Sequence, residues 1–361
     1  MSPQKESSPL LQDFDKTVET PDTKAEDDIR KEYSIDPKYT EIILQPFEYY
    51  QKLPSKNIRR KIADIFNYWY RCSKEDIDRA STAMHGLHNA SLIIDDIEDG
   101  SDMRRGQPAA HIQFGVPLAL NAANYVYFDS VKRIIEEKND EATPEDRLKA
   151  TLEFVNAMMV MHVAQGMEIF WRDENLKGTN SKDSKTFQHI PTEQEYFDII
   201  VKKTAGQFVM LSESLKERSK TLYKDQPALS AHVLASSMGY HFQIRDDLLN
   251  LISNTYEAGK GFCEDITEGK YSFPIIYTLN RYHEKDGIGI DKAARLLEIL
   301  RMRTTDRALK KEAYDIIEES GAFEYTKNVL REYHGKIGRE VLRLGGNPVF
   351  VEHMDIFAEV F

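Results

Sequence analysis

Residues 80–99 read ASTAMHGLHNASLIIDDIED, a run of apolar and small residues that leads into a block of acids. Apolar or small side chains recur at helical spacing along this run, which predicts a helix with one face turned toward the protein interior. Side chains four positions apart share one face of a helix, so Ser91, Asp95 and Asp99 are expected to follow one another along the inward face. Glu98 is expected to face away. The inward face therefore passes from apolar residues directly to carboxylates.

The carboxylates of Asp95, Asp96 and Asp99 are close enough to repel one another, so a cation is expected among them. Mg²⁺ fits, because it takes hard oxygen ligands from one or two carboxylates and completes its shell with water and phosphate. Arg104 and Arg105 follow in a short glycine-containing segment, and guanidinium groups suit diphosphate oxygens. A DDxxD motif taken alone could equally be a solvated helix end. The apolar run before it and the arginines after it favour the metal site.

Residues 243–250 read QIRDDLLN and repeat this design about 150 residues further along the chain. Asp246 and Asn250 are four residues apart, Asp247 lies beside them, and the flanking apolar residues predict another helix. Two acidic helices of one design are expected to face each other across a cavity. Two lysines follow downstream as candidate diphosphate ligands, namely Lys260 and Lys270.

The bulk composition is that of a globular protein long enough to bury a sizeable core, with 361 residues, 41% hydrophobic and 30% charged. A net charge of −12 argues against nucleic acid as a partner, since phosphate backbones require a basic face. The only cysteines, Cys72 and Cys263, are far apart, so neither a disulfide framework nor a zinc site is expected. The polar N-terminus and the lack of a long apolar run predict a cytoplasmic protein with no transmembrane segment.

The chain divides by composition near its start. The first 30 residues carry eight acids, four bases and few large apolar side chains, so residues 1–34 are expected to be a disordered acidic tail or linker. Residues 35–361 are expected to form one domain, because helix signals dominate from Tyr39 onward and strand signals are nearly absent. The predicted fold class is all-α, a single-domain bundle of about ten or more helices.

Local signals place some of these helices. Pro144 is expected at the first position of a helix, and Thr192 with Glu195 has the pattern of a capping box. The polar stretch 174–191 predicts a long surface loop.

Three segments carry a family resemblance: LIIDDIEDGSDMRRG at 92–106, FQIRDDLLNL at 242–251 and KGFCEDITEGKYSFPI at 260–275. The first two resemble the aspartate-rich motifs of the trans-isoprenyl diphosphate synthases. The similarity extends from about Tyr39 to residues 344–348. It is greatest with fungal geranylgeranyl diphosphate synthases, including the prenyltransferase domains of fungal bifunctional terpene synthases. The resemblance implies helices around a central active-site cavity, as in isoprenoid synthases.

The resemblance also implies an activity, the condensation of isopentenyl diphosphate with dimethylallyl, geranyl or farnesyl diphosphate to give geranylgeranyl diphosphate. Isopentenyl diphosphate would be bound by Lys56, Arg59, His88 and Arg105. The allylic diphosphate would be bound by Arg104, Lys203, Thr204 and Gln243, together with Asn250, Lys260 and Lys270. The implied catalytic set is Asp95, Asp96, Asp99, Asp246, Asp247 and Lys203, and the implied ligands of three Mg²⁺ ions are Asp95, Asp96, Asp99 and Asp246.

Two positions depart from the family pattern. Ser55 replaces a usual glycine before Lys56, and Asn250 replaces the last aspartate of the second motif. An amide oxygen still suits Mg²⁺ or a bound water.

Product length should depend on the side chains that lie below Asp95 and limit the growing chain, which we call the floor. Ser91 is small and leaves room for a growing chain, and Leu87 lies roughly 12 Å along the helix axis from Asp95. The resemblance nominates Tyr127, Phe128 and His162 as bulky floor residues that stop growth at twenty carbons. Aromatic core packing is an equal alternative for each of them.

Two other functions remain open from the sequence. A class I terpene cyclase is also all-α, but no Asn-x₃-Ser/Thr-x₃-Glu triad follows Asn250. A non-catalytic synthase-like subunit would be expected to lose metal ligands. By the resemblance, the enzyme would form a homo-oligomer, a dimer or an assembly of dimers, and would supply diterpene biosynthesis. It would be either a free enzyme or part of a chain with a cyclase domain.

Overall fold

The structure is a computed structural model that describes residues 35–135, 144–177, 189–219, 230–253, 262–284 and 289–358. The expected tail at 1–34 and Lys260 lie outside these residues. Contacts divide the chain into two compact units, 1–45 and 46–361, and each is considered by itself. The first unit contains α3 (Pro37–Ile43), whose N-terminus is capped by the Asp36 side chain. The candidate site residues all belong to the second unit.

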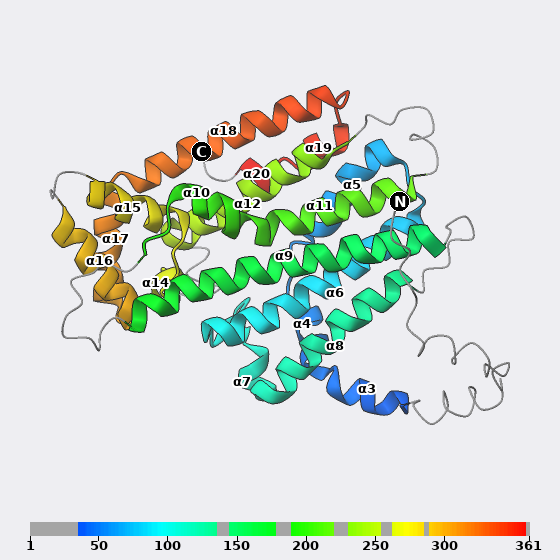
Figure 1. Cartoon of the computed structure of the whole chain (residues 1–361), viewed down its shortest axis with the longest axis horizontal. Helices are drawn as coiled ribbons and strands as arrows, with labels where there is room; N and C mark the ends of the chain where they lie inside the picture. Colours follow the sequence, from blue (N-terminus) through cyan, green and yellow to red (C-terminus); the bar gives the residue numbers. More distant parts are fainter. Residues whose placement is uncertain are drawn as a thin grey trace, which may run out of the picture. The chain divides into compact units, whose positions relative to one another are not determined.

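The second unit is all-α in its described part, as predicted (Figure 1). Its helices in chain order are α4 (Gln45–Lys52), α5 (Ile58–Tyr70), α6 (Lys74–Asp99), α7 (Ala110–Phe114), α8 (Val116–Ile135), α9 (Pro144–Lys177), α10 (Glu193–Glu195), the π-helix η3 (Tyr196–Ile200), α11 (Val201–Arg218), α12 (His232–Ile252), α14 (Glu264–Glu268), α15 (Phe273–Glu284), α16 (Ile290–Met302), α17 (Arg307–Glu319), α18 (Ala322–Arg343), α19 (Pro348–Glu352) and α20 (Asp355–Ala358). The two-residue strands β1 (Met103–Arg104) and β2 (Gln107–Pro108) pair antiparallel in the turn after α6. None of the described helices is both long and apolar enough to cross a membrane.

The helix predicted over 80–99 is confirmed and is longer than the motif. Ser73 caps the N-terminus of α6 by accepting from the Asp76 amide, and Gly100 ends the helix in the left-handed conformation at φ 68°. The first acidic block therefore occupies the last two turns of a 26-residue helix.

The other local predictions are confirmed with one correction. Helix α9 begins at Pro144, and Thr192 and Glu195 form a capping box in both directions. The predicted loop at 174–191 was placed too early, because α9 continues to Lys177. Residues 178–188 lie outside the described part.

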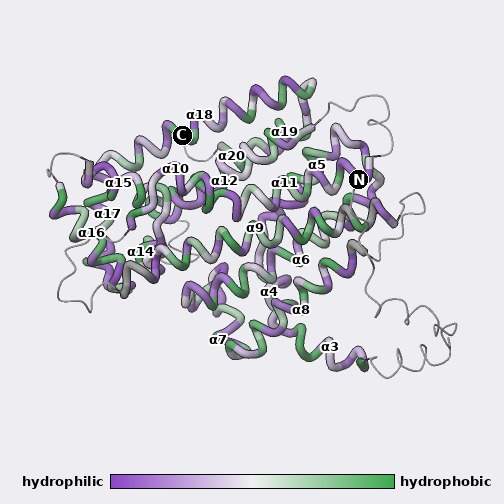
Figure 2. The backbone as a smooth tube through the Cα atoms, viewed as in Figure 1, coloured by the Kyte–Doolittle hydropathy of each residue, from purple (hydrophilic) through white to green (hydrophobic). Residues whose placement is uncertain are grey.

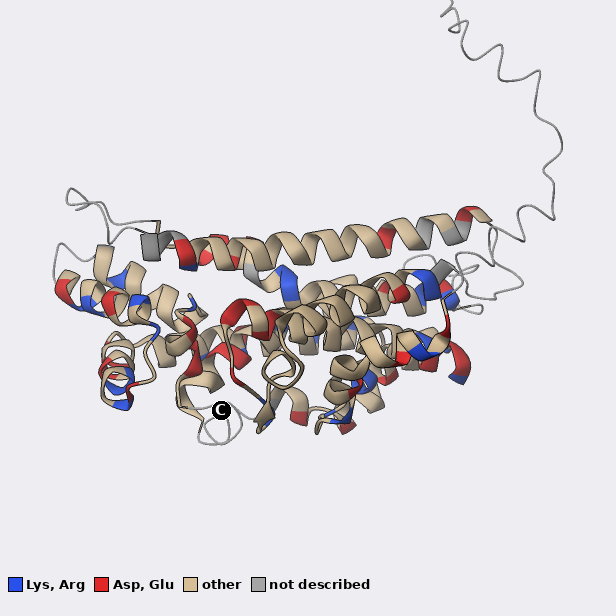
Figure 3. Ribbon diagram, turned by 90° about the horizontal axis from the view of Figure 1, so that it is seen from below, with Lys and Arg blue, Asp and Glu red and all other residues tan. Residues whose placement is uncertain are grey.

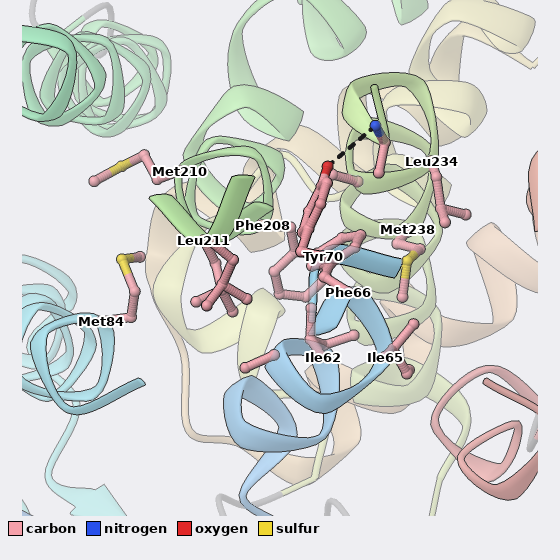
Figure 4. Packing of buried hydrophobic residues seen from close by; sticks show 14 of the residues in the cluster. Ile62, Ile65, Phe66, Tyr70, Met84, Phe208, Met210, Leu211, Leu234 and Met238 are labelled. Carbon is pink, nitrogen blue, oxygen red and sulfur yellow. Dashed lines mark hydrogen bonds between the residues drawn. The ribbon is translucent and has the colours of Figure 1, made fainter. Parts of the chain in front are cut away.

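Helix α11 is central to the bundle, since it contacts α5, α6, α9, η3 and α12 (Figure 1). Figure 2 shows hydrophobic and hydrophilic residues alternating along most helices, as expected of helices with one buried face. One buried apolar cluster joins α5, α11 and α12, and Figure 4 shows its members Ile62, Phe66, Tyr70, Phe208, Leu211, Leu234 and Met238. The Tyr70 hydroxyl within it accepts a hydrogen bond from the Ala231 amide at 3.3 Å.

Helices α11 and α12 are in close backbone contact at Gly239. A Cβ atom there would lie 2.3 Å from the Cα and 2.7 Å from the Cβ of Ala205. Glycine alone lets the two helix backbones approach this closely. The approach matters for the site, because Ala205 follows Thr204 directly and Gly239 lies one turn before Gln243.

Gly239→Ala should destabilise the protein by about 1–3 kcal/mol, because the added methyl group must push α11 from α12. Gly338→Ala on α18 is the matched control, since a Cβ there meets nothing within 4 Å, and it should leave stability unchanged or raise it slightly. Urea unfolding followed by circular dichroism measures both. Equal midpoints for the two variants would contradict the close packing.

Candidate active site

The buried end of α6 is held by one carboxylate, that of Asp96. Its side chain is fully buried, and Arg104 donates to both of its oxygens, from Nε at 3.0 Å and from Nη2. The Tyr50 hydroxyl donates to Oδ2 and itself accepts from the Ala110 amide at 3.2 Å. Asp96 therefore fixes the turn after α6 to α4, and its role as a metal ligand stays a prediction.

Arg104 has the same structural role as the other half of this pair. Burial lowers the pKa of Arg104, but the carboxylate of Asp96 raises it by more, so the net pKa lies above its ordinary value. Its Nη2 also lies 3.6 Å from Oδ2 of Asp95. Contact with a substrate phosphate stays a prediction for Arg104.

Asp95 faces α9, as does Glu98. Gln165 of α9 donates from Nε2 to Oδ1 of Asp95 at 3.1 Å and to Oε2 of Glu98 at 2.8 Å. The expectation that Glu98 faces away is therefore wrong, because one amide group joins the two acids. Burial raises the pKa of Glu98, and the carboxylate of Asp95 adds to the rise.

Asp99 lies one turn further along the same face. Arg172 of α9 donates from Nη1 to Oδ1 of Asp99 at 2.8 Å. Burial raises the pKa of Asp99 well above its ordinary value, and Asp95 and Glu268 raise it further. Negative charge at this end of α6 is thus only partly balanced by the protein.

Two lysines connect α6 to the opposite side of the site through Glu168 of α9. Lys203 Nζ lies 3.3 Å from Oδ1 of Asp95 and 2.9 Å from Oε2 of Glu168. Lys270 Nζ lies 3.8 Å from Oε1 of Glu168 and 3.2 Å from Oδ1 of Asp247. Burial lowers the pKa of Lys203, but the carboxylates of Asp95 and Glu168 raise it and prevail. Alternating charges thereby join α6, α11, α9, the segment before α15 and α12.

In the second acidic motif, as in the first, one aspartate is buried and its neighbour is partly exposed. Asp247 is buried and accepts from the Tyr196 hydroxyl at 2.7 Å, the Phe273 amide at 3.0 Å and Nε2 of Gln243 at 2.9 Å, besides Lys270. Its oxygens are fully used by protein donors, which gives Asp247 a positioning role in this structure, and its catalytic role stays a prediction.

Asn250 and Gln243 are likewise committed to protein partners. Asn250 is buried, and its Oδ1 accepts from the Asp265 amide at 3.0 Å, which fixes the start of α14. Its role as a substrate ligand stays a prediction. Gln243 accepts from the Thr204 hydroxyl through Oε1. Asp246 is partly exposed beside them, and its role as metal ligand stays a prediction.

A π-helix sets the position of Lys203 and Thr204. The capping box starts α10, and η3 follows it at once, with the Val201 amide bonded to the Tyr196 carbonyl. A π-helical turn rotates the residues after it toward a different side of the helix, and such turns are common at functional sites. The Tyr196 hydroxyl, in the same π-helix, donates to Asp247 of α12. This short segment therefore helps to position both Lys203 on α11 and the second acidic motif on α12.

A second charged group, the cation group, consists of the guanidinium groups of Arg59 of α5 and Arg105, with the imidazoles of His85 and His88 of α6 beside them. Burial lowers the pKa of Arg59, and Arg105 lowers it further. Burial lowers the pKa of His88 well below its ordinary value, with Arg59 and Arg105 as further causes. Arg105 adopts a left-handed conformation at φ 54° in the turn between β1 and β2. Burial and neighbouring positive charge together lower these pKa values, so a bound anion would be favourable here.

The loop before α5 borders this cation group. Lys56 is exposed, and Oγ of Ser55 accepts from the Asn57 amide at 3.2 Å, so the serine at the departing position orders the loop. Arg59 donates to Oε1 of Gln207 on α11, from Nε at 3.0 Å.

The predicted floor is only partly supported by the structure. The rings of Tyr127 and His162 meet edge to face with centroids 5.4 Å apart. Burial raises the pKa of Tyr127, and the carboxylates of Glu98 and Asp95 raise it further. Leu87 is buried in the core, and Ser91 donates to the His88 carbonyl. Phe128 is 76% exposed and His162 is also exposed, and the floor assignments stay predictions.

Five residues of the site were missed by the sequence analysis: Tyr50, Gln165, Glu168, Arg172 and Gln207. Three of them carried a readable signal. Gln165, Glu168 and Arg172 have the spacing i, i+3, i+7 of one helix face, in a stretch of α9 that is otherwise mainly apolar.

The residues fit a hard divalent cation that is completed by a substrate. Within the described chain, no three acidic, histidine or cysteine side chains converge into a metal site made of protein alone. Asp95 and Asp99 nevertheless lie one turn apart, and Oε1 of Glu168 is buried without a hydrogen bond. Mg²⁺ typically binds through one or two carboxylates and takes its remaining ligands from water and phosphate.

A family model described as polyprenyl synthetase matches residues 40–317. The chain belongs to the polyprenyl synthetase family. It is 37% identical over 315 residues to a geranylgeranyl pyrophosphate synthase of Dictyostelium discoideum, covering 87% of this chain and 92% of the relative. It is 36% identical over 316 residues to a geranylgeranyl pyrophosphate synthase of Mucor circinelloides f. lusitanicus, with coverage of 87% and 92%. It is also 38% identical over 308 residues to a terpene synthase of Matsumurasca onukii, with coverage of 85% and 90%.

Within this polyprenyl synthetase, Asp95 and Asp96 should respond differently to loss of charge. Asp96→Asn breaks a fully buried ion pair and should destabilise the metal-free protein by about 3–5 kcal/mol. Asp95→Asn, at a partly exposed carboxylate, should cost less than half as much. Urea unfolding in EDTA compares them. Similar losses for the two variants would contradict the division of the motif into one structural and one exposed acid.

Proposed function

We propose that this polyprenyl synthetase is a Mg²⁺-dependent trans-prenyltransferase that condenses isopentenyl diphosphate with short allylic diphosphates to give geranylgeranyl diphosphate. The observation that carries this proposal is that two differently charged groups of side chains lie along one helix, α6. One is made of basic side chains, and the other is made of carboxylates bridged by lysines. A reaction between two diphosphates needs two such sites. The names of the relatives from Dictyostelium and Mucor support the same product.

The cation site suits isopentenyl diphosphate, which keeps its diphosphate throughout the reaction. Burial lowers the pKa of His88, and repulsion from the nearby positive charges of Arg59 and Arg105 lowers it further. An added anion would relieve that repulsion. Binding here therefore needs charge from the protein and no metal, and Lys56 on the exposed loop would add a further contact.

The carboxylate site suits the allylic diphosphate, whose leaving group departs with its charge. Asp95, Asp99 and Asp246 would hold Mg²⁺, and three ions per site stays a prediction. When bound, the metal would neutralise charge on the departing diphosphate. Lys203, already poised between Asp95 and Glu168, would grip the same diphosphate as a fixed cation. Lys270 has the matching position beside Asp247.

The remaining chemistry needs positioning more than a protein nucleophile. The double bond of isopentenyl diphosphate would form the new C–C bond to the allylic carbon as the C–O bond to the diphosphate breaks. The proton then lost would pass to the released diphosphate, so no side chain is assigned as general base. The Thr204 hydroxyl donates a hydrogen bond to Gln243, so the lone pairs of the Thr204 oxygen can face positive charge.

A terpene synthase is the second candidate, favoured by the name of the Matsumurasca relative. A cyclase acts on one diphosphate substrate and has no use for the cation group of Arg59, His88 and Arg105. Their convergence in this chain supports elongation over cyclisation. The carboxylates of Asp95, Asp99 and Asp246 count against a non-catalytic subunit.

The decisive experiment incubates the wild-type chain with isopentenyl diphosphate, Mg²⁺ and each of the three short allylic primers, followed by product sizing. Geranylgeranyl diphosphate should form from every primer, and EDTA should abolish it. Absence of elongation with all primers would refute the proposal. Hydrocarbon formed from geranylgeranyl diphosphate without isopentenyl diphosphate would favour the cyclase.

The same assay reports on the floor. His162→Ala removes one ring of the pair with Tyr127 and should shift the product toward chains longer than twenty carbons. Tyr68→Ala on α5 is the matched control, because Tyr68 is an exposed aromatic outside the predicted floor and outside α8 and α9. An unchanged product from His162→Ala would remove this pair from the floor.

We further propose that a second copy of this chain covers α8 and the middle of α9. Figure 3 shows few charged residues along the middle of α9. The exposed apolar side chains on these helices are Val116, Leu120, Tyr125, Phe128, Leu148, Leu152, Met159, Val160, Val163 and Phe170. Patches of this kind mark protein interfaces. Light scattering of the purified chain tests the homo-oligomer, which a monomer would refute. The cytoplasmic location, the diterpene role and a cyclase domain in the parent chain stay predictions.

A further inference from the structure

The end of α16 reaches the carboxylates of α6 through one side chain, that of Arg303. Helix α16 ends at Met302, and Arg303 follows in a left-handed conformation at φ 45°. This turn directs the side chain away from the helix axis toward α6. Its Nη2 donates to the main-chain carbonyl of Asp99, 204 residues earlier in the chain.

The Arg303 side chain packs beside Gly269, the residue before Lys270. A Cβ atom at Gly269 would lie 3.6 Å from Cγ of Arg303, 3.7 Å from Cγ of Arg172 and 3.0 Å from the Leu300 carbonyl oxygen. Gly269 ends α14 at φ 68°, so both the conformation and the crowding require glycine. Thr267 Oγ1 donates to the Thr304 carbonyl at 3.2 Å and ties the same two segments together.

Two arginine side chains from other segments therefore cap the C-terminus of α6. Arg172 donates from Nη2 to the Glu98 carbonyl at 3.1 Å, and Arg303 donates to the Asp99 carbonyl. The last carbonyls of a helix have no partner within it and carry partial negative charge, so cationic donors stabilise them. Arg172 also binds the Asp99 carboxylate, whereas the hydrogen bond of Arg303 goes to the backbone.

We propose that Arg303 is a positioning residue that fixes the end of α6, with Asp95 and Asp99, against the segment that carries Lys270. The inference rests on the proposed function, since those groups would hold the Mg²⁺ and diphosphate from two sides. Ser101 supports the same connection by donating to Glu268 of α14 at 3.2 Å. Without Arg303 the last turn of α6 would lose one of its two cationic caps, and the carboxylates would no longer be held at a set distance from Lys270.

The test compares Arg303→Ala, Arg303→Lys and a control on the same helix, Arg295→Ala, which removes an ion pair with Glu312 of α17. Hydrogen exchange measures the last turn of α6, where the Gly100 and Ser101 amides both donate to the Asp96 carbonyl. Exchange there should be about tenfold faster in Arg303→Ala, because one charged hydrogen bond is lost. Arg303→Lys should recover part of the protection, and Arg295→Ala should match the wild type.

The second readout is the rise in melting temperature produced by Mg²⁺ with inorganic diphosphate. Arg303→Ala should need about tenfold more Mg²⁺ for half of the wild-type rise, whereas Arg295→Ala should need the wild-type amount. Kinetically, the KM for the allylic substrate should rise and that for isopentenyl diphosphate should not.

Unchanged exchange at Gly100 and Ser101 in Arg303→Ala would overturn the positioning role, whatever reaction the enzyme performs. Equal increases of both KM values would overturn it too, because they would indicate general loss of structure. If the wild type shows no elongation, the proposed function fails, while the exchange result still decides whether Arg303 holds α6.

Discussion

The arrangement of the site depends on one buried carboxylate, Glu168, held between Lys203 and Lys270. Each lysine also contacts a member of one acidic motif, Asp95 in the case of Lys203 and Asp247 in the case of Lys270. Buried charges are tolerated only when paired, so removing any member would leave a costly unpaired neighbour. The alternation of charge thus forces α6, α9, α11 and the segment before α15 into one arrangement. The chemistry of the site depends on that arrangement.

The apolar core supplies the close and fixed helix packing on which these alternating charges depend. Gly239 lets α12 touch α11 at Ala205, and that contact places Thr204 against Gln243. Gln243 then supports Asp247. The caps at the end of α6 extend the same order to Asp99. Stability and catalysis therefore rest on shared contacts, and the acids that hold the structure are neighbours of those that would hold the metal.

The sequence predicted the helices well, because capping residues and apolar spacing are local signals. It located both acidic motifs but could not divide their members. Asp95 and Asp96 are adjacent, and spacing alone does not say which will meet Arg104 and Tyr50 from other segments. Glu98 was misplaced because Gln165 reaches it from α9. The exposure of Phe128 could not be predicted, because helical spacing does not distinguish a face that lines a cavity from one left exposed in the single chain.

The central claim is that α6 serves two diphosphate sites, one built of protein cations and one that requires metal. Equilibrium binding tests it most directly, with isopentenyl diphosphate and an unreactive thio-analogue of farnesyl diphosphate titrated in EDTA and in Mg²⁺. We expect isopentenyl diphosphate to bind in EDTA and to lose its binding in Arg59→Gln, while the analogue should bind only with Mg²⁺ and lose its binding in Asp95→Asn. Binding of both ligands that depends equally on Mg²⁺, or binding of isopentenyl diphosphate that survives Arg59→Gln unchanged, would contradict the claim.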